Sequence, residues 1–247
     1  MSNQSNPHDR NINTSDTMQT SPKRKKNLWY WLRMVTKVIL YAHLIFVMLI
    51  GIISVIYINT NPPVTILMLY RDGFQAKKPS FVPLRNTSST FQRDLINLED
   101  GNFRKHFGID IEAIKRARAK NQEVGRTAQG GSTISQQLAR TLFLTPHRTY
   151  LRKYLELIIT FELELILGKD RILELYINYA ELGKGVYGFN DASLRYYNKS
   201  FAKTSTDQKI RMMTILASPI NYSPQTLHQN SALARRYKFI YRWHKYH

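Results

Sequence analysis

The chain of 247 residues is long enough for one good-sized domain and an additional segment, and too short for two large enzyme domains. Its formal charge of +19, from 36 Lys and Arg against 17 Asp and Glu, predicts an anionic partner such as nucleic acid, anionic lipid or a phosphorylated substrate. The absence of cysteine excludes disulfides, thiolate metal sites and a cysteine nucleophile.

Two segments precede the main body of the chain. Residues 1–27 are polar and charged, so they cannot bury enough surface to fold and are predicted to form a disordered basic tail. Residues 28–58 are predicted to form an interfacial segment and a transmembrane anchor. Within it, Val38 to Ile58 carry no formal charge and, as a helix, would cross a hydrocarbon core about 30 Å thick.

The basic residues beside this anchor predict its orientation. Lys and Arg occupy positions 23–26, 33 and 37 before it, whereas the residues directly after it, NTNPPVT, include none. The N-terminus is therefore expected to be cytoplasmic and the rest of the chain to lie outside the membrane. An uncleaved anchor is favoured over a cleaved signal peptide, because the apolar run is too long and no small-residue cleavage site follows it.

Residues 59–247 are predicted to form one mainly helical domain. Residues 151–182 place large apolar side chains at mixed three- and four-residue intervals, with Gly168 as a break between two helices. No alternation is long enough to indicate a core built on a sheet. Residues 64–82, where VTILMLY lies between Pro-rich flanks, are the best candidate for a short extended segment.

Candidate functional residues fall in four clusters along this domain. In the first, residues 98–110, the adjacent carboxylates Glu99 and Asp100 precede Phe103 and His106. A carboxylate in a partly apolar wall has its pKa raised, which makes it useful as a proton acceptor or donor. The simpler alternative is an acidic pair in the first turn of a helix, where the helix dipole favours negative charge.

The second cluster, residues 130–144, joins two glycines, hydroxyl residues that can cap a helix, and an amphipathic run that begins at Ile134. Free backbone N–H groups at such a helix start suit a phosphate or sugar oxygen. A plain capped helix explains the same pattern. The neighbouring amides of Gln136 and Gln137 need hydrogen-bond partners if that helix is buried.

The third cluster, residues 148–156, places Arg152, Lys153 and Glu156 on one helical face. This pattern fits either an ordinary surface ion-pair ladder or a carboxylate held beside cations that grip a diphosphate. The fourth cluster, residues 168–197, combines a helix with a loop punctuated by glycines, and packing and turns explain most of it.

In this order and spacing, the clusters resemble the peptidoglycan glycosyltransferases of family 51, found in bifunctional penicillin-binding proteins and in monofunctional transglycosylases. The shared patterns between Leu98 and Tyr222 are ED-x-x-F-x-x-H-x-G, GGST-x-x-QQL, RK-x-x-E and IL-E-x-Y-x-N. Residues 216–224 and 234–239 resemble the family's Pro-containing segment and Arg-rich closing helix. The chain length leaves no room for a transpeptidase domain, which indicates the monofunctional type. The family's usual Lys-Asn after QQL-x is replaced by Arg140 and Thr141, which keeps a cation but changes its shape.

The resemblance implies a lysozyme-like helical fold with a small membrane-facing lobe, for which residues 109–128 are the candidate. It implies inverting transfer of a lipid-diphosphate-linked glycan to the 4-hydroxyl of lipid II, with release of polyprenyl diphosphate. Glu99 would take the hydroxyl proton. Glu156 would be the second catalytic carboxylate, and would either orient the cations and a Mg²⁺ ion or polarise the leaving group. The residues expected to bind substrate are Asp100, Gln136, Gln137, Arg140, Arg148, Arg152 and Lys153.

The resemblance also allows a divalent cation, Mg²⁺ or Mn²⁺, as the one cofactor, without a dedicated set of protein metal ligands. The expected partners are lipid II, the lipid-linked growing glycan, the bacterial inner membrane and cell-wall synthesis proteins, with no nucleic acid. One alternative is a lysozyme-like enzyme that cleaves glycan, which would not need the cationic clusters. The other is a basic membrane-tethered scaffold or nucleic-acid binder, which conflicts with the predicted topology.

Overall fold

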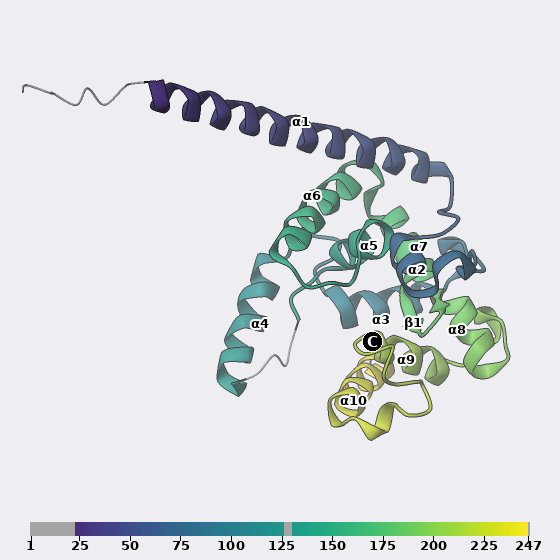
Figure 1. The fold of residues 1–247 in the computed structure, drawn as a ribbon. Helices are drawn as coiled ribbons and strands as arrows, with labels where there is room; N and C mark the ends of the chain where they lie inside the picture. Colours follow the sequence, from purple (N-terminus) through teal and green to yellow (C-terminus); the bar gives the residue numbers. More distant parts are fainter. Residues whose placement is uncertain (1–22, 126–129, 247) are drawn as a thin grey trace, which may run out of the picture. The chain divides into compact units, whose positions relative to one another are not determined.

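The computed structural model describes residues 23–125 and 130–246, with side chains from residue 27 onward. In these ranges the chain is mainly helical, with helices α1 to α10, short 3₁₀ helices and one two-stranded sheet (Figure 1). The predicted helical class is therefore confirmed. The chain divides into two compact units, Met1–Ile45 and Phe46–His247.

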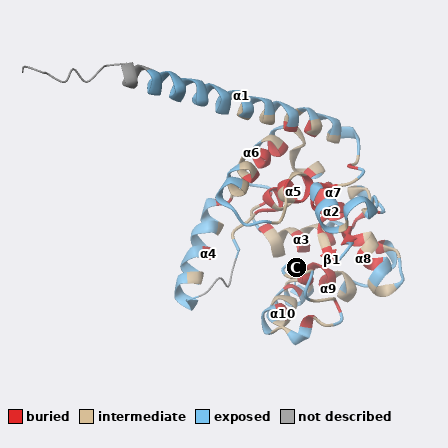
Figure 2. Ribbon diagram, in the orientation of Figure 1, coloured by how far each residue is buried: buried red, intermediate tan, exposed pale blue. Residues whose placement is uncertain are grey.

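Helix α1, Lys23–Asn59, contains the predicted anchor. Its stretch Asn27–Asn59 is long and apolar enough to cross a membrane, and only 11% of the most apolar window is buried, unlike a core helix. Figure 2 shows the exposed surface along α1. Residues 23–27 belong to this helix, so the predicted disordered tail is wrong for that part, and positions 1–22 lie outside the described residues.

The core of the second unit forms around two helices, α5, Ile134–Phe143, and α7, Gly168–Tyr179, which pack against each other. Helices α6, Tyr150–Ile166, and α2, Ile66–Asp72, pack against α5 (Figure 1). The fully buried aliphatic side chains of α5 and α7 include Ile134, Leu138, Ile172, Leu173 and Leu175. Each such side chain contributes about 1.5–3 kcal/mol by leaving water, which makes this pair the rigid base of the unit.

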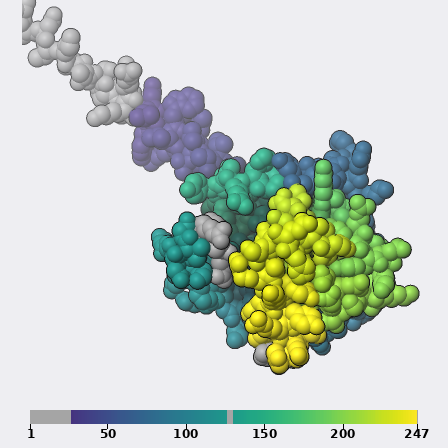
Figure 3. Space-filling model, turned by 90° about the horizontal axis from the view of Figure 1, so that it is seen from below, coloured from purple at the N-terminus to yellow at the C-terminus, as the bar shows by residue number. Residues whose placement is uncertain are grey.

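The other helices lie around this base. Helix α10 packs on α9 and α3, and α8 packs on α7, while Figure 3 shows α10, in yellow, covering much of one face. Their bounds are Ser89–Asp100 for α3, Ile111–Val124 for α4, Gly188–Tyr197 for α8, Thr206–Ile215 for α9 and Ser231–Tyr246 for α10. The 3₁₀ helices are Gly73–Gln75, Leu84–Asn86, Phe201–Lys203 and Leu227–Gln229.

The extended segment expected at residues 64–82 is wrong, because its apolar part forms helix α2. Thr65 caps this helix by accepting a hydrogen bond from the backbone N–H of Met68 at 3.2 Å. Leu67 and Met68 are both buried, and a short apolar run cannot be assigned to strand or helix by periodicity alone. The cap and the packing against α5 select the helix.

The one described sheet lies in the glycine-punctuated loop of the fourth cluster. Strand β1, Glu181–Gly183, pairs antiparallel with β2, Val186–Tyr187. Gly188 follows with φ of 76°, and a Cβ there would come within 2.4 Å of the carbonyl oxygen of Asn178. Glycine is therefore required at this close approach of the loop to α7.

Candidate active site

Glu99 lies in the last turn of α3, so the alternative of an acidic pair at a helix N-terminus is wrong. Its side chain is only 9% exposed. Gln137 of α5 donates from Nε2 to Glu99 Oε2 at 3.0 Å, and the guanidinium of Arg236 on α10 pairs with Oε1. Two helices distant in sequence therefore hold the two oxygens of this carboxylate.

A third side chain fixes the amide that holds Glu99. Tyr176 of α7 donates its hydroxyl to Gln137 Oε1 at 2.9 Å. Burial, and next the charge of Glu99, raise the pKa of Tyr176 well above its usual value, so the phenol keeps its proton and donates. Because the amide oxygen of Gln137 accepts from Tyr176, its NH₂ group faces Glu99.

Asp100 joins α3 to the start of α5. His106 Nε2 lies 2.9 Å from Asp100 Oδ1, and the backbone N–H of Ile134 donates to Oδ2 at 3.0 Å. Burial raises the pKa of Asp100, and the hydrogen bond from His106 partly offsets this. His106 is a packed, hydrogen-bonded histidine, 9% exposed. The binding of substrate by Asp100 stays a prediction.

The start of α5 is a capped helix. Thr133 accepts from the backbone N–H of Gln136 at 3.2 Å, and the side chain of Gln136 accepts in return from the backbone N–H of Thr133 at 3.1 Å. These contacts form a capping box, and Asp100 takes the N–H of Ile134. The plain-cap alternative is therefore confirmed, and the binding of a phosphate or sugar oxygen at this helix start stays a prediction.

Glu156 is a buried carboxylate on α6, with a side chain only 1% exposed. Arg152 pairs with its Oε2, and Lys153 Nζ lies 2.5 Å from its Oε1. The ion pairs are thus not an exposed surface ladder. Because both oxygens face cations of the same helix, the contacts support the orienting role for Glu156 more than direct contact with a sugar.

Two cavities adjoin these residues. One, of about 280 Å³, is lined by the partners of both glutamates, Gln137 and Arg152. Arg140, Arg148 and Tyr176 also line it. Glu99 and Glu156 are therefore each in contact with a residue that lines one strongly cationic cavity.

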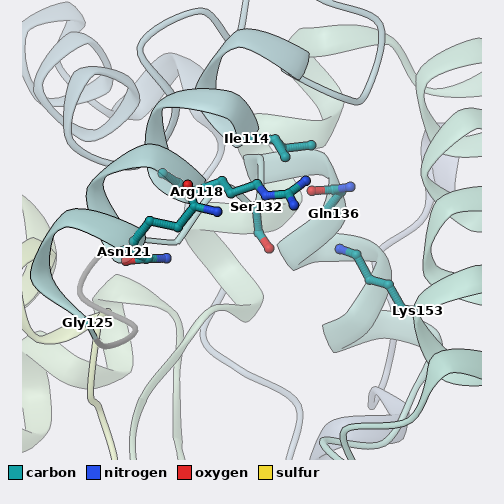
Figure 4. A pocket seen from close by; sticks show the side chains of 10 residues that line it. Ile114, Arg118, Asn121, Gly125, Ser132, Gln136 and Lys153 are labelled. Carbon is teal, nitrogen blue, oxygen red and sulfur yellow. The ribbon is translucent and has the colours of Figure 1, made fainter.

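The second cavity, of about 710 Å³, lies between α4 and the starts of α5 and α6. Arg118, Ser132, Gln136 and Lys153 surround it, with Ile114 contributing an apolar wall (Figure 4). Lys153 also bonds Glu156, and Gln136 is the chain neighbour of Gln137. The predicted binding residues other than Asp100 are thus divided between two cavities, with α5 and α6 contributing to both.

Comparison with known proteins assigns the family. The family model described as Transglycosylase matches residues 67–244, which contain both glutamates and the residues of the two cavities. The chain belongs to the transglycosylase family. A "Biosynthetic peptidoglycan transglycosylase" of Janthinobacterium sp. (strain Marseille) is 37% identical over 226 residues, 88% of this chain and 95% of the relative.

Two further relatives carry the same description. One, from Herminiimonas arsenicoxydans, is 38% identical over 226 residues, 88% of this chain and 95% of the relative. Another, from Dechloromonas aromatica (strain RCB), is 45% identical over 145 residues, 59% of this chain and 63% of the relative. The chain is therefore an enzyme of the transglycosylase family, and the lysozyme-like helical class is confirmed.

Three residues near the predicted transglycosylase site were missed by the sequence reasoning: Tyr176, Glu181 and Arg236. Glu181 lines the cationic cavity and is held by Arg71, whose Nε lies 2.9 Å from Glu181 Oε1. Burial raises the pKa of Glu181, and the hydrogen bond from Arg71 opposes this. Tyr176 and Arg236 lie inside sequence patterns that resemble the family. Their contacts are with helices distant in the chain, and residue spacing in the sequence does not reveal such contacts.

Proposed function

We propose that this transglycosylase polymerises lipid II into peptidoglycan glycan strands. The observation that carries the proposal is Glu99, a nearly buried carboxylate behind a cavity lined by Arg140, Arg148 and Arg152. A proton acceptor beside clustered arginines suits a reaction in which a hydroxyl is deprotonated and a diphosphate departs. A glycan-cleaving enzyme would require the first feature only.

Glu99 acts as the general base. The 4-oxygen of the acceptor sugar attacks the anomeric carbon of the donor from the side opposite the diphosphate, and its proton passes to the Glu99 carboxylate. The carbon–oxygen bond to the diphosphate breaks, the leaving group carries away the electron pair, and the anomeric configuration inverts. A positioned base of this kind contributes about 10²- to 10⁴-fold in rate.

The arginines stabilise the departing lipid diphosphate. Planar guanidinium groups bind phosphate oxygens with two parallel hydrogen bonds, so Arg140 in place of the family's usual lysine keeps the positive charge and adds this two-bond geometry. Glu156 orients Arg152 and Lys153, which lie on either side of its carboxylate. The cations are therefore already in place when negative charge develops on the leaving group.

A divalent cation, Mg²⁺ or Mn²⁺, enters the proposal only as a counter-ion of the diphosphate. Within the described ranges, no group of three or more His, Asp or Glu side chains is arranged to hold a metal ion. Mg²⁺ is commonly held by substrate phosphates and few protein ligands.

The apolar helix α1 supports a membrane anchor, and the basic residues before it support an N-terminus in the cytoplasm and an enzyme domain outside the bacterial inner membrane. Both substrates are lipids, and confinement to one membrane raises their effective concentration near the site. Helix α4, which carries Arg118 of the second cavity, is the proposed membrane-facing lobe. Cell-wall synthesis proteins are the expected protein partners, and nucleic acid is not.

The test is to incubate the full-length protein in detergent with lipid II. The expected result is a glycan polymer that a muramidase degrades. Release of fragments from finished peptidoglycan, without polymer formed from lipid II, would instead establish the lysozyme-like alternative. Salt-sensitive retention of DNA without polymerisation would establish the basic scaffold.

A further inference from the structure

Helix α10 carries a basic and aromatic face that the proposed reaction does not use. It borders a cavity of about 430 Å³, and we name this set of residues the α10 strip: Arg235, Lys238, Phe239, Arg242, Trp243 and Tyr246. Their spacing places them on one side of the helix, away from Leu233 and Ile240, which are buried in the core. Phe239 is 54% exposed and Tyr246 72% exposed, so the strip combines open aromatic surface with positive charge.

The positive charge of this face is not balanced by acidic residues of α10 itself. The α10 sequence SALARRYKFIYRWHKY contains no Asp or Glu. The carboxylates that meet α10 lie on its inner side, where Glu99 pairs with Arg236 and Asp94 pairs with His244. In the part of the chain that the structure describes, the strip cations Lys238 and Arg242 form no ion pair. They are therefore available to an external anion.

The strip adjoins the α10 residue that holds Glu99. Arg236, which pairs with Glu99, lies seven residues before Trp243 and therefore on the same edge of the helix. From Arg235 to Tyr246 the strip extends about 16 Å along α10, at 1.5 Å per residue. The strip therefore begins beside the arginine that holds Glu99.

The strip also lies far from the end of the predicted membrane anchor. Within the second unit, α10 and the C-terminal end of α1 are at opposite ends (Figure 1). Figure 3, which views the molecule from below relative to Figure 1, shows α10 in front. A basic aromatic helix can bind a lipid surface, but its place on this unit argues against that use here.

We propose that the α10 strip binds the glycan strand product as it leaves the active site. This inference rests on the proposed function, because it takes the strand to be peptidoglycan. Sugar rings present flat C–H faces that pack on aromatic side chains such as Phe239 and Tyr246. The peptides attached to the strand carry carboxylates, which pair with Lys238 and Arg242. The mixture of rings and cations thus matches the mixture of rings and carboxylates on the product.

Binding of this kind gives the strip a role in product length. A strand held on α10 keeps its lipid-linked end near Glu99, which raises the effective concentration of that end for the next addition. A strand that is released must find the site again by diffusion in the membrane. The strip therefore favours many additions to one strand over the start of new ones.

The test is direct binding of lipid-free, uncrosslinked glycan strands with intact peptides to the full-length protein, measured by fluorescence anisotropy. Two double variants divide the strip: Phe239→Ser with Tyr246→Ser, and Lys238→Gln with Arg242→Gln. The matched control is Lys199→Gln with Lys203→Gln, two exposed lysines on other elements. Each strip variant is expected to weaken binding about tenfold, which corresponds to 1.4 kcal/mol, and the control to leave it unchanged.

Several results would contradict the proposal that the α10 strip binds the glycan product. One is equal binding by the strip variants and the control, with melting temperatures showing that all are folded. Another is equal competition by polyglutamate, which has carboxylates without sugar rings. A third is anionic lipid vesicles binding through these residues while glycan strands do not. Failure of the wild type to polymerise lipid II would contradict the proposed function instead, because the binding assay needs no turnover.

Discussion

Replacing Tyr176 by Phe tests whether the hydrogen-bond chain from Tyr176 through Gln137 controls Glu99. The ring of Tyr176 is buried and is retained by Phe, so the packing of α7 on α5 is preserved. What is lost is the 2.9 Å hydrogen bond to Gln137 Oε1, and an amide oxygen is left without its donor. An unsatisfied buried acceptor costs about 1–3 kcal/mol. Gln137 is then free to turn its oxygen toward the Glu99 carboxylate.

If this free energy is also lost from the transition state, kcat falls about fivefold to 150-fold. The assay is the initial rate of lipid II consumption at several substrate concentrations, which separates kcat from KM. Tyr179→Phe is the matched control, because Tyr179 is a buried tyrosine of the same helix whose hydroxyl donates to the carbonyl of Pro62 at 2.5 Å. Both variants should lose stability, but only Tyr176→Phe should lose kcat. Equal kcat values for the two would refute the positioning role.

Glu156→Gln removes the charge that holds Arg152. The variant should have a free energy of unfolding lower by about 1–3 kcal/mol and a lower polymerisation rate. Unchanged values of both would contradict the orienting role of Glu156. Burial raises the pKa of Glu162 to about 7 from 4.5, so the folded state binds this proton more tightly than the unfolded chain. That contribution to stability is complete below pH 4.5 and is lost as the pH rises through about 7. The melting temperature of the wild type should therefore fall across this interval, and that of Glu162→Gln should fall by less. Gly188→Ala should destabilise the fold far more than Gly168→Ala. Both glycines have a positive φ, but of the two only Gly188 lacks room for a Cβ. Similar unfolding curves for the two variants would contradict this prediction.

The sequence predicted the parts of the fold that depend on local pattern. The start of α5 at Ile134 followed from capping residues before an amphipathic run, and the break at Gly168 from a glycine between two apolar periodicities. Residues 64–82 were mistaken for an extended segment, because a short apolar run has no decisive period. The choice of helix there came from the Thr65 cap and from burial against α5, and the second of these is a tertiary effect.

The sequence also predicted both glutamates and the cations as site residues, but it did not predict which of them line each of the two cavities. Helical spacing predicted that Arg152 and Lys153 share a face with Glu156, which the structure confirms. Spacing could not reveal that Arg236 meets Glu99, because that contact joins helices far apart in the chain. Nor could it show that Asp100 accepts a hydrogen bond from the backbone N–H of Ile134. Such contacts depend on how helices pack.

The polymerisation rate of Glu99→Gln tests the central claim most directly. This change keeps the shape of the side chain and removes the proton acceptor, so lipid II consumption should fall about 10²- to 10⁴-fold. Asp170→Asn is the matched control, because it removes one negative charge from a side chain that is 74% exposed and should leave the rate unaltered. Glycan polymer formed by folded Glu99→Gln at the wild-type rate would contradict the account.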